Sequence, residues 1–468
     1  MISYMKQKKF PDAITIIIFI MIIFIVLTWL IPAGEFEYKE FNGREIVVPN
    51  SSHKVDPNPQ GLFAFLTAPI KGFISASQII GFCLLVGGAF GILNRTGAID
   101  AGLNNVINYS KNHKQSKRWV LVLLMIAFSV CGATFGMSES VLVFIMITIP
   151  LALALGYDSI IGISISFLAA GVGFAGALTN PFTIGIAQGI AEIPLFSGWE
   201  YRLFIWLILT SIAIVYVLFY ARKIEKNPAK SSVYNLDQSR DLSEVNSNNS
   251  DLTFNTKRKL ILGLLFLSLI IIIVGSNKWS WYINEISALF IALGFLSAIV
   301  YRLSASEAVK AFVNGAKDMI MAGLVIGLAK GLLIIATDGK IIGTILNYLA
   351  SLTDNMNKVF SVQFMFLFQG ILNFFVPSGS GQAALTMPIM APLSDIIGVS
   401  RQTAVLCFQM GDGIFNMIIP TSGVTMGVLS IAKIPYNKWV KWLFPLIIIL
   451  IITVFILLIP PVLFFTYS

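Results

Sequence analysis

Charged residues are scarce in this sequence, and the shortage excludes an ordinary soluble protein. Only 12% of the 468 residues are charged, 56% are hydrophobic, and the mean hydropathy is +0.83. A soluble domain of this length could not cover so much apolar surface with so few charges. Runs such as 14–30, 203–220 and 443–460 approach the length that crosses the hydrocarbon core of a bilayer. The composition therefore predicts an all-α polytopic membrane protein.

Histidine and cysteine are also rare, and this limits the chemistry that the chain can carry. His53 and His113, the only histidines, are expected in loops, which leaves no zinc site inside the membrane. Cys83, Cys131 and Cys407 lie in apolar runs, so we expect no disulfide. The sequence has no Gly-x-x-x-x-Gly-Lys-Ser/Thr motif, so ATP is not expected to drive the function directly. We expect no cofactor other than a coupling ion, Na⁺ or H⁺.

The net charge of +9 is gathered in basic clusters at 6–9, 111–118, 222–259 and 433–441. Such clusters mark cytoplasmic loops, whereas the acidic loops 34–60 and 192–200 are assigned to the outside. This interpretation predicts a multi-pass membrane protein with a cytoplasmic N-terminus. A nucleic-acid partner is not expected, because no basic cluster lies in a polar folded domain.

Two apolar stretches, one in each half of the chain, are interrupted by glycine, serine and an ionisable or amide residue. They are 134–140, with the sequence TFGMSES, and 376–382, with the sequence VPSGSGQ. Irregular backbone at membrane depth survives only where protein buries it or where it lines a wet cavity. We interpret each stretch as the tip of a re-entrant hairpin, 119–155 in the first half and 360–397 in the second.

Other landmarks recur at the same separation along the chain. Pro150 and Pro392 are as far apart as Gly156 and Gly398, and apolar runs that break near 179–181 and 420–423 follow the two hairpins. This pattern predicts two inverted repeats, each with a re-entrant hairpin and a broken transmembrane helix, as in secondary transporters with a midplane site. The predicted divisions are 1–75 (N-terminal helix and extracytoplasmic loop), 76–221 (first repeat), 222–259 (cytoplasmic linker), 260–318 (scaffold helices) and 319–468 (second repeat).

Polar residues at the tips and breaks are the candidate site. An ionisable group inside the membrane is costly and marks function by default, although Glu139 at a hairpin tip could simply face water. The predicted substrate-binding residues are Ser138, Glu139, Ser140, Asn180, Ser378, Gly379, Ser380, Gln382, Asp412 and Asn416. The predicted ion-coupling residues are Glu139, Thr179, Asp412, Thr421 and Ser422, whose oxygens could hold Na⁺. The plainer alternative is that these serines and threonines bond their own backbone beside proline kinks.

Lys330 is ambiguous from the sequence. It could meet a substrate carboxylate, pair with an acid such as Asp412, or sit in the interior of the bundle.

Two further motifs carry little weight. Residues 171–176, GVGFAG, match the dinucleotide fingerprint, but no strand or βαβ unit surrounds them, so close helix packing explains them better. Residues 411–413 invite comparison with intramembrane aspartyl proteases, yet Gln409 stands where that motif has glycine. We therefore expect no catalytic residue and no metal centre. An intramembrane hydrolase and a passive channel remain the rival classes.

Several stretches together resemble a known family: 10–13 (FPDA), 29–36 (WLIPAGEF), 97–100 (GAID), 135–139 (FGMSE) and 411–416 (GDGIFN). The chain resembles the YfcC branch of the DcuC-type anaerobic carriers, within the ion transporter superfamily. The resemblance implies a secondary transporter of a prokaryotic inner membrane, with an elevator-type movement and built as a homodimer. It implies substrates among amino acids (arginine/ornithine exchange included), four-carbon dicarboxylates or peptides.

The acids narrow the substrate within that range. Glu139 and Asp412 near one site favour a cationic substrate or a coupling cation over a bare dicarboxylate, which would call for more cationic groups than Lys330 alone. We expect exchange of basic amino acids, with a four-carbon dicarboxylate carrier as the alternative.

Overall fold

The structure is a computed structural model that describes residues 13–41, 44–48, 51–99, 101–102, 105, 114–240, 254–279, 281, 283–351 and 357–463. Helices dominate these residues. In the described chain, seven helices are long and apolar enough to cross a membrane, or eight if the bent pair Ala305–Asp318 and Gly323–Asp338 is one span. The prediction of an all-α polytopic membrane protein is confirmed.

Short strands lie in the loop that follows the first helix. β1 (Gly34–Glu35) pairs antiparallel with β4 (His53–Lys54), and β2 (Tyr38–Phe41) pairs antiparallel with β3 (Arg44–Val47). The basic cluster at 6–9, the start of the 111–118 cluster and residues 241–253 of the 222–259 cluster lie outside the described residues.

One set of helices, which we call the scaffold group, packs together through small residues. α15 and α14 pack on α3, and α16 packs on α2 and α1. Glycines allow these backbones to touch: a Cβ on Gly91 would lie 2.3 Å from the carbonyl oxygen of Ala311. The scaffold group comprises α1 (Ala13–Leu30), α2 (Leu62–Ser75), α3 (Ser77–Arg95), α13 (Thr256–Lys278), α14 (Ile283–Tyr301), α15 (Ala305–Asp318) and α16 (Ile320–Asp338).

α15 begins at Ala305, directly after Ser304. Its start is fixed by a capping box, in which the Ser304 hydroxyl accepts from the backbone N–H of Glu307 and the Glu307 carboxylate accepts from the backbone N–H of Ser304.

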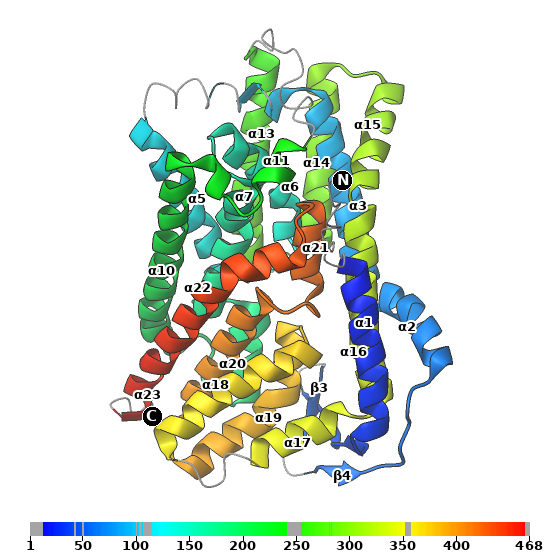
Figure 1. Ribbon diagram of the computed structural model, residues 1–468, viewed down its shortest axis with the longest axis vertical. Helices are drawn as coiled ribbons and strands as arrows, with labels where there is room; N and C mark the ends of the chain where they lie inside the picture. The colour runs from blue at the N-terminus through cyan, green and yellow to red at the C-terminus, as the bar shows by residue number, and fades with distance from the viewer. Residues whose placement is uncertain are drawn as a thin grey trace, which may run out of the picture.

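The other set, which we call the hairpin group, contains both interrupted pairs and both broken helices (Figure 1). Two α-helices flank each tip: α5 (Lys114–Phe135) with α6 (Val141–Ala154), and α18 (Lys358–Phe375) with α19 (Gly379–Ile397). The remaining members are α7 (Ser159–Ile163), η1 (Ser164–Leu168), α8 (Ala169–Gly176), η2 (Pro181–Gly185), α9 (Ile186–Ile190), α10 (Trp199–Lys226), α20 (Arg401–Asn416), α21 (Gly423–Ile431), α22 (Tyr436–Leu457) and α23 (Ile459–Leu463). α17 (Ile342–Ser351) leads into α18.

The core of the hairpin group forms around α8, whose small residues admit two neighbours. A Cβ on Gly173 would lie 2.0 Å from the carbonyl oxygen of Ser129 on α5, and one on Gly413 of α20 would lie 2.5 Å from the Cα of Ala175. The glycine-rich stretch 171–176 therefore serves close helix packing, as the sequence indicated.

Side-chain caps restart a helix after three of the four interruptions. Asn180 Oδ1 accepts from the backbone N–H of Phe182 at 2.9 Å, Ser378 Oγ from Gly381 at 3.4 Å, and Ser422 Oγ from Thr425 at 3.3 Å. Such caps satisfy backbone donors that a helix start leaves open. Part of the polarity at the breaks is thus needed by the fold itself.

The two groups meet where α16 passes α21, which Figure 1 shows in the centre of the molecule. The α21 side of this boundary has few protruding side chains, because glycine occupies two of its contact positions. A Cβ on Gly423 would lie 3.6 Å from the Cα of Ile326, and one on Gly427 would lie 3.4 Å from the Cδ1 of the same residue.

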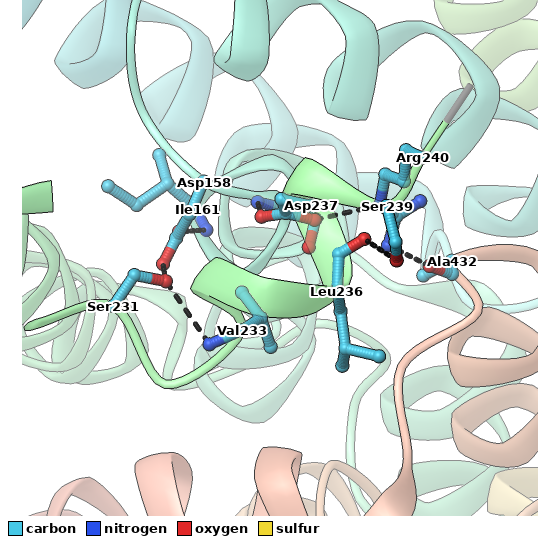
Figure 2. A network of polar contacts seen from close by, with 10 residues as sticks. Asp158, Ile161, Ser231, Val233, Leu236, Asp237, Ser239, Arg240 and Ala432 are labelled. Carbon is cyan, nitrogen blue, oxygen red and sulfur yellow. Dashed lines mark hydrogen bonds and ion pairs between the residues drawn. The ribbon is translucent and has the colours of Figure 1, made fainter. Parts of the chain in front are cut away.

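Residues 227–240, within the predicted linker, are folded against one end of the hairpin group, and we call them the strap (Figure 2). Asp158, which caps α7, accepts a hydrogen bond from the Ser231 hydroxyl at 2.7 Å. Asp237 accepts from the first backbone N–H of α7 and pairs with Arg240 at 2.7 Å. Arg240 in turn donates to the carbonyl of Ala432, directly after α21. The strap thereby joins the start of one broken helix to the end of the other.

Candidate functional site

A cavity of about 530 Å³ lies on the boundary between the two groups, and we call it the boundary cavity. Its scaffold wall consists of α3 and α16 and carries Lys330 among apolar side chains. Its other wall consists of the two hairpin tips and the start of α21 and carries Glu139, Ser378 and Thr421. A carboxylate and an ammonium group thus share one cavity, each contributed by a different group of helices.

A second cavity of about 370 Å³ lies within the hairpin group, and we call it the inner cavity. Its polar residues are Ser138, Asn416 and Ser422, while aromatic and aliphatic side chains such as Phe167 and Phe174 form most of its wall. Val424 lines both cavities, so they are neighbours.

Asp412 is the centre of a buried polar cluster behind the cavities. Its Oδ1 accepts hydrogen bonds from the side-chain amides of Asn416, at 3.0 Å, and Asn373. The Asn373 amide also donates to Gln382 Oε1 at 3.0 Å, and Gln382 donates to Gln369 Oε1 at 2.7 Å. Asp412, Asn373, Gln382 and Gln369 have no exposed surface. The Asp412 carboxyl group is therefore held by neutral amides.

Three oxygens of this region have no hydrogen-bond partner among the described residues: Asp412 Oδ2, Asn373 Oδ1 and Thr183 Oγ1. Asp412 Oδ2 and the Thr183 side chain lie close to the N-terminus of α19, since a Cβ on Gly379 would stand 2.9 Å from Asp412 Oδ2 and 2.6 Å from Thr183 Cγ2. A buried carboxylate is costly without a counter-charge. Carboxylate, amide and hydroxyl oxygens are ligands that suit a small hard cation, and the same carboxylate can take a proton.

The predicted site residues separate into two sets by their position. Those that line one of the cavities are Ser138, Glu139, Ser378, Asn416, Thr421 and Ser422. Those outside both linings are Ser140, Thr179, Asn180, Gly379, Ser380, Gln382 and Asp412. In the second set, Asp412 and Gln382 form the buried cluster and Asn180 caps η2. Thr179 is exposed and donates to the carbonyl of Thr134 at 3.2 Å.

Two members of the buried cluster, Asn373 and Gln369, were not predicted from the sequence. They stand four residues apart in the apolar run of α18, so both lie on one face of that helix. Polar amides at that spacing inside a membrane helix were the available signal. Lys330, which the sequence left open, faces the boundary cavity with Glu139 and forms no ion pair with Asp412 among the described residues.

Two cavities at paired helix interruptions, inside a bundle of membrane-spanning helices, define the chain as a membrane transporter. Comparison with known proteins makes this specific, because the DcuC family, described as "C4-dicarboxylate anaerobic carrier", matches residues 10–462. The chain belongs to the DcuC family and is a transporter of the YfcC type.

Two relatives match over nearly their full lengths. YfcC of Escherichia coli strain K12, which carries a provisional name as a basic amino acid antiporter, is 36% identical over 93% of this chain and 93% of its own. A protein of Haemophilus influenzae with no assigned function is 29% identical over 94% of this chain and 95% of its own.

Among solved structures, the YdaH transporter of Alcanivorax borkumensis aligns with a TM-score of 0.42 at 14% identity, over 96% of this chain and 98% of its own. MtrF of Neisseria gonorrhoeae, described with a class of antimetabolite efflux pumps, aligns with a TM-score of 0.43 at 14% identity, over 98% of this chain and 97% of its own.

Proposed function

We propose that the protein exchanges basic amino acids, such as arginine and ornithine, across the inner membrane of a prokaryotic cell. The observation that carries the proposal is the position of the Glu139 side chain, which lies at a hairpin tip and lines the boundary cavity. An acid at this position offers a partner to a cationic substrate group. The provisional name of the Escherichia coli relative supports the same substrate class.

The charges around the two cavities support a basic amino acid over a dicarboxylate. At neutral pH arginine carries two cationic groups and one carboxylate. The region holds two acids, Glu139 and Asp412, and one base, Lys330, a balance that favours a cationic substrate and a coupling cation over an anion. A four-carbon dicarboxylate carries two negative charges and would meet two acids. The dicarboxylate carrier remains the second candidate, because the family description favours it.

The inner cavity fits the apolar part of such a substrate. Phe167 and Phe174 offer apolar surface to an aliphatic side chain, and an aromatic face also attracts a cation. Asn416 and Ser422 supply polar groups in the same cavity.

The Asp412 cluster is assigned to the coupling cation, Na⁺ or H⁺. The three buried oxygens without a partner would hold it, and the Asp412 carboxylate would supply the charge. Asn416 donates a hydrogen bond to Asp412 and also lines the inner cavity. Binding of the cation in the cluster would therefore change the position of Asn416 at the substrate site.

Movement is assigned to the hairpin group, which would slide along the scaffold group in the manner of an elevator. The boundary between α16 and α21, with few protruding side chains on the α21 side, supports this assignment. The N-terminus is placed in the cytoplasm, on the side of the basic clusters. The scaffold group would form the contact between the two subunits of a homodimer.

Counterflow in proteoliposomes tests the function. Vesicles loaded with unlabelled arginine should accumulate labelled arginine or ornithine in exchange, whereas labelled aspartate and succinate should stay outside. The matched Glu139→Gln variant, which keeps the shape and loses the charge, should need a roughly tenfold higher arginine concentration for the same exchange. Uptake of succinate alone would favour the dicarboxylate carrier. The absence of exchange with every compound would defeat both candidates.

A further inference from the structure

Lys330 is fixed to the scaffold wall of the boundary cavity. On either side of it, α16 touches α2, because a Cβ on Gly72 would lie 2.2 Å from the carbonyl oxygen of Gly327 and 2.6 Å from the backbone nitrogen of Gly331. Such close backbone contact leaves no room for side chains to slide between the two helices. Lys330 therefore stays in place when the hairpin group moves.

Glu139 is fixed to the opposite wall. The tip that carries it turns at Gly136, whose φ is +67°, and a Cβ there would lie 2.5 Å from the side-chain amide of Asn180 at the break of the first broken helix. The tip and the broken helix are thus packed together, so Glu139 moves with the hairpin group. Lys330 and Glu139 face one cavity but belong to opposite sides of the boundary.

We propose that Lys330 holds the empty transporter in place by serving as the counter-charge of Glu139 until a cationic substrate group replaces it. The inference rests on the proposed function. Without substrate, movement would take the Glu139 carboxylate away from the ammonium group and along an apolar wall that includes Ile326, Ala329 and Leu333. An unpaired charge in such surroundings is strongly disfavoured.

A bound basic amino acid removes that barrier. Its cationic group travels with Glu139 and keeps the carboxylate paired throughout the movement. Lys330 remains behind, on the side that the hairpin group vacates and that water enters. Loaded transporters move and empty ones do not, which is the requirement for obligatory exchange. Lys330 is in this account a positioning residue and not a ligand of the substrate.

Two flux modes of one preparation distinguish this role from substrate binding. Proteoliposomes loaded with labelled arginine are diluted into buffer with unlabelled arginine, which measures exchange, or without it, which measures net efflux. Lys330→Met should keep exchange within about threefold of the wild type and raise net efflux about tenfold, because the empty transporter can now return. Lys330→Arg, which keeps the positive charge, should remain coupled. Lys310→Met, on the exposed side of α15, is the matched control and should change neither mode.

The opposite results overturn the inference. Loss of both modes in a folded Lys330→Met protein would mean that the lysine binds substrate. Wild-type values in both modes would mean that the lysine does not restrain the empty transporter. If the Met variant fails to fold, Lys330→Gln replaces it, with the same expected results. A wild-type protein that exchanges no basic amino acid would overturn the proposed function as well, and the wild-type measurement alone reveals that case.

Discussion

The two membrane carboxylates of this protein occupy opposite kinds of surroundings. Glu139 is half-buried at the first hairpin tip, faces a cavity and shares it with a lysine. Asp412 has no exposed surface, and one of its oxygens is held by two neutral amides while the other has no partner among the described residues. The two acids therefore differ in how far they are exposed.

This difference indicates separate tasks. A carboxylate on a cavity wall can meet a group as large as an amino acid, and its counter-charge can be exchanged. A carboxylate sealed among amides can accept only a proton or a small cation. In our account, Glu139 recognises the substrate and Asp412 holds the coupling ion, so their variants should fail in different ways.

The largest effect is expected at Asp412. Asp412→Asn keeps the size and one acceptor oxygen but loses a charge-assisted interaction worth ~2–3 kcal/mol, so exchange should fall about 100-fold. Arginine binding, measured as a thermal shift, should survive while the response to Na⁺ or pH disappears. A variant that transports normally and keeps its ion response would remove Asp412 from coupling.

Glu139→Gln should impair substrate binding and leave the binding of the coupling ion intact. Because the substrate cation loses its partner, the arginine concentration that half-saturates the thermal shift should rise roughly tenfold or more, while the ion response remains. Equal loss of the ion response in both variants would contradict the division of tasks between the two acids.

Gly379→Ala probes the contact between the second tip and the Asp412 cluster. The added methyl group would lie 2.6 Å from Thr183 Cγ2 and 2.9 Å from Asp412 Oδ2. Overpacking of this kind costs ~1–3 kcal/mol, so transport should fall about tenfold and the apparent affinity for the ion should fall with it. Gly189→Ala in α9, where no atom lies within 4 Å, is the matched control. Similar activity in both variants would show that the tip is loosely packed.

The smallest effect is expected in the strap. Arg240→Ala removes the pair with Asp237, whose side chains are 18% and 11% exposed, together with the hydrogen bond to Ala432. The loss should be ~1–2 kcal/mol, a decrease of a few degrees in Tm, with exchange nearly unchanged. Strong loss of exchange at an unchanged Tm would show that the strap takes part in transport.

The strap also predicts a pH dependence. Burial raises the pKa of Asp158 above its ordinary value of 3.8, although hydrogen bonds from Tyr220 and Ser231 act in the opposite direction. A carboxylate with a raised folded-state pKa favours the folded state at acid pH and loses that contribution as the pH rises through the raised value. Asp158→Asn should therefore gain Tm relative to the wild type between acid and neutral pH. A difference in Tm that does not change with pH would contradict this.

The sequence predicted the helical membrane fold, both interrupted helix pairs and both broken helices, because glycine, proline and polar residues inside apolar runs have few structural explanations. It also singled out Glu139 and Asp412. It could not separate their surroundings, since burial depends on which helices meet. The amides around Asp412 come from α18, α19 and α20, and only the packing of these helices brings Asn373, Gln382 and Asn416 together.

Two other features depended on the same long-range packing. Lys330 had three possible placements in the sequence, and its place in the boundary cavity follows from the contact between α16 and α21. The strap lies in a polar stretch of low hydrophobicity, yet Asp237 and Arg240 fold it against α7 and the end of α21. No local sequence pattern predicts these contacts of Asp237 and Arg240.

A cross-link over the boundary cavity tests the central claim, that the hairpin group carries the substrate past α16. Ala329→Cys on α16 and Val424→Cys on α21 line opposite walls of that cavity, in a chain whose Cys83, Cys131 and Cys407 are replaced. After cross-linking, purified protein should still show a thermal shift with arginine but no counterflow, and a reductant should restore the counterflow. Full exchange by the cross-linked protein would contradict the account.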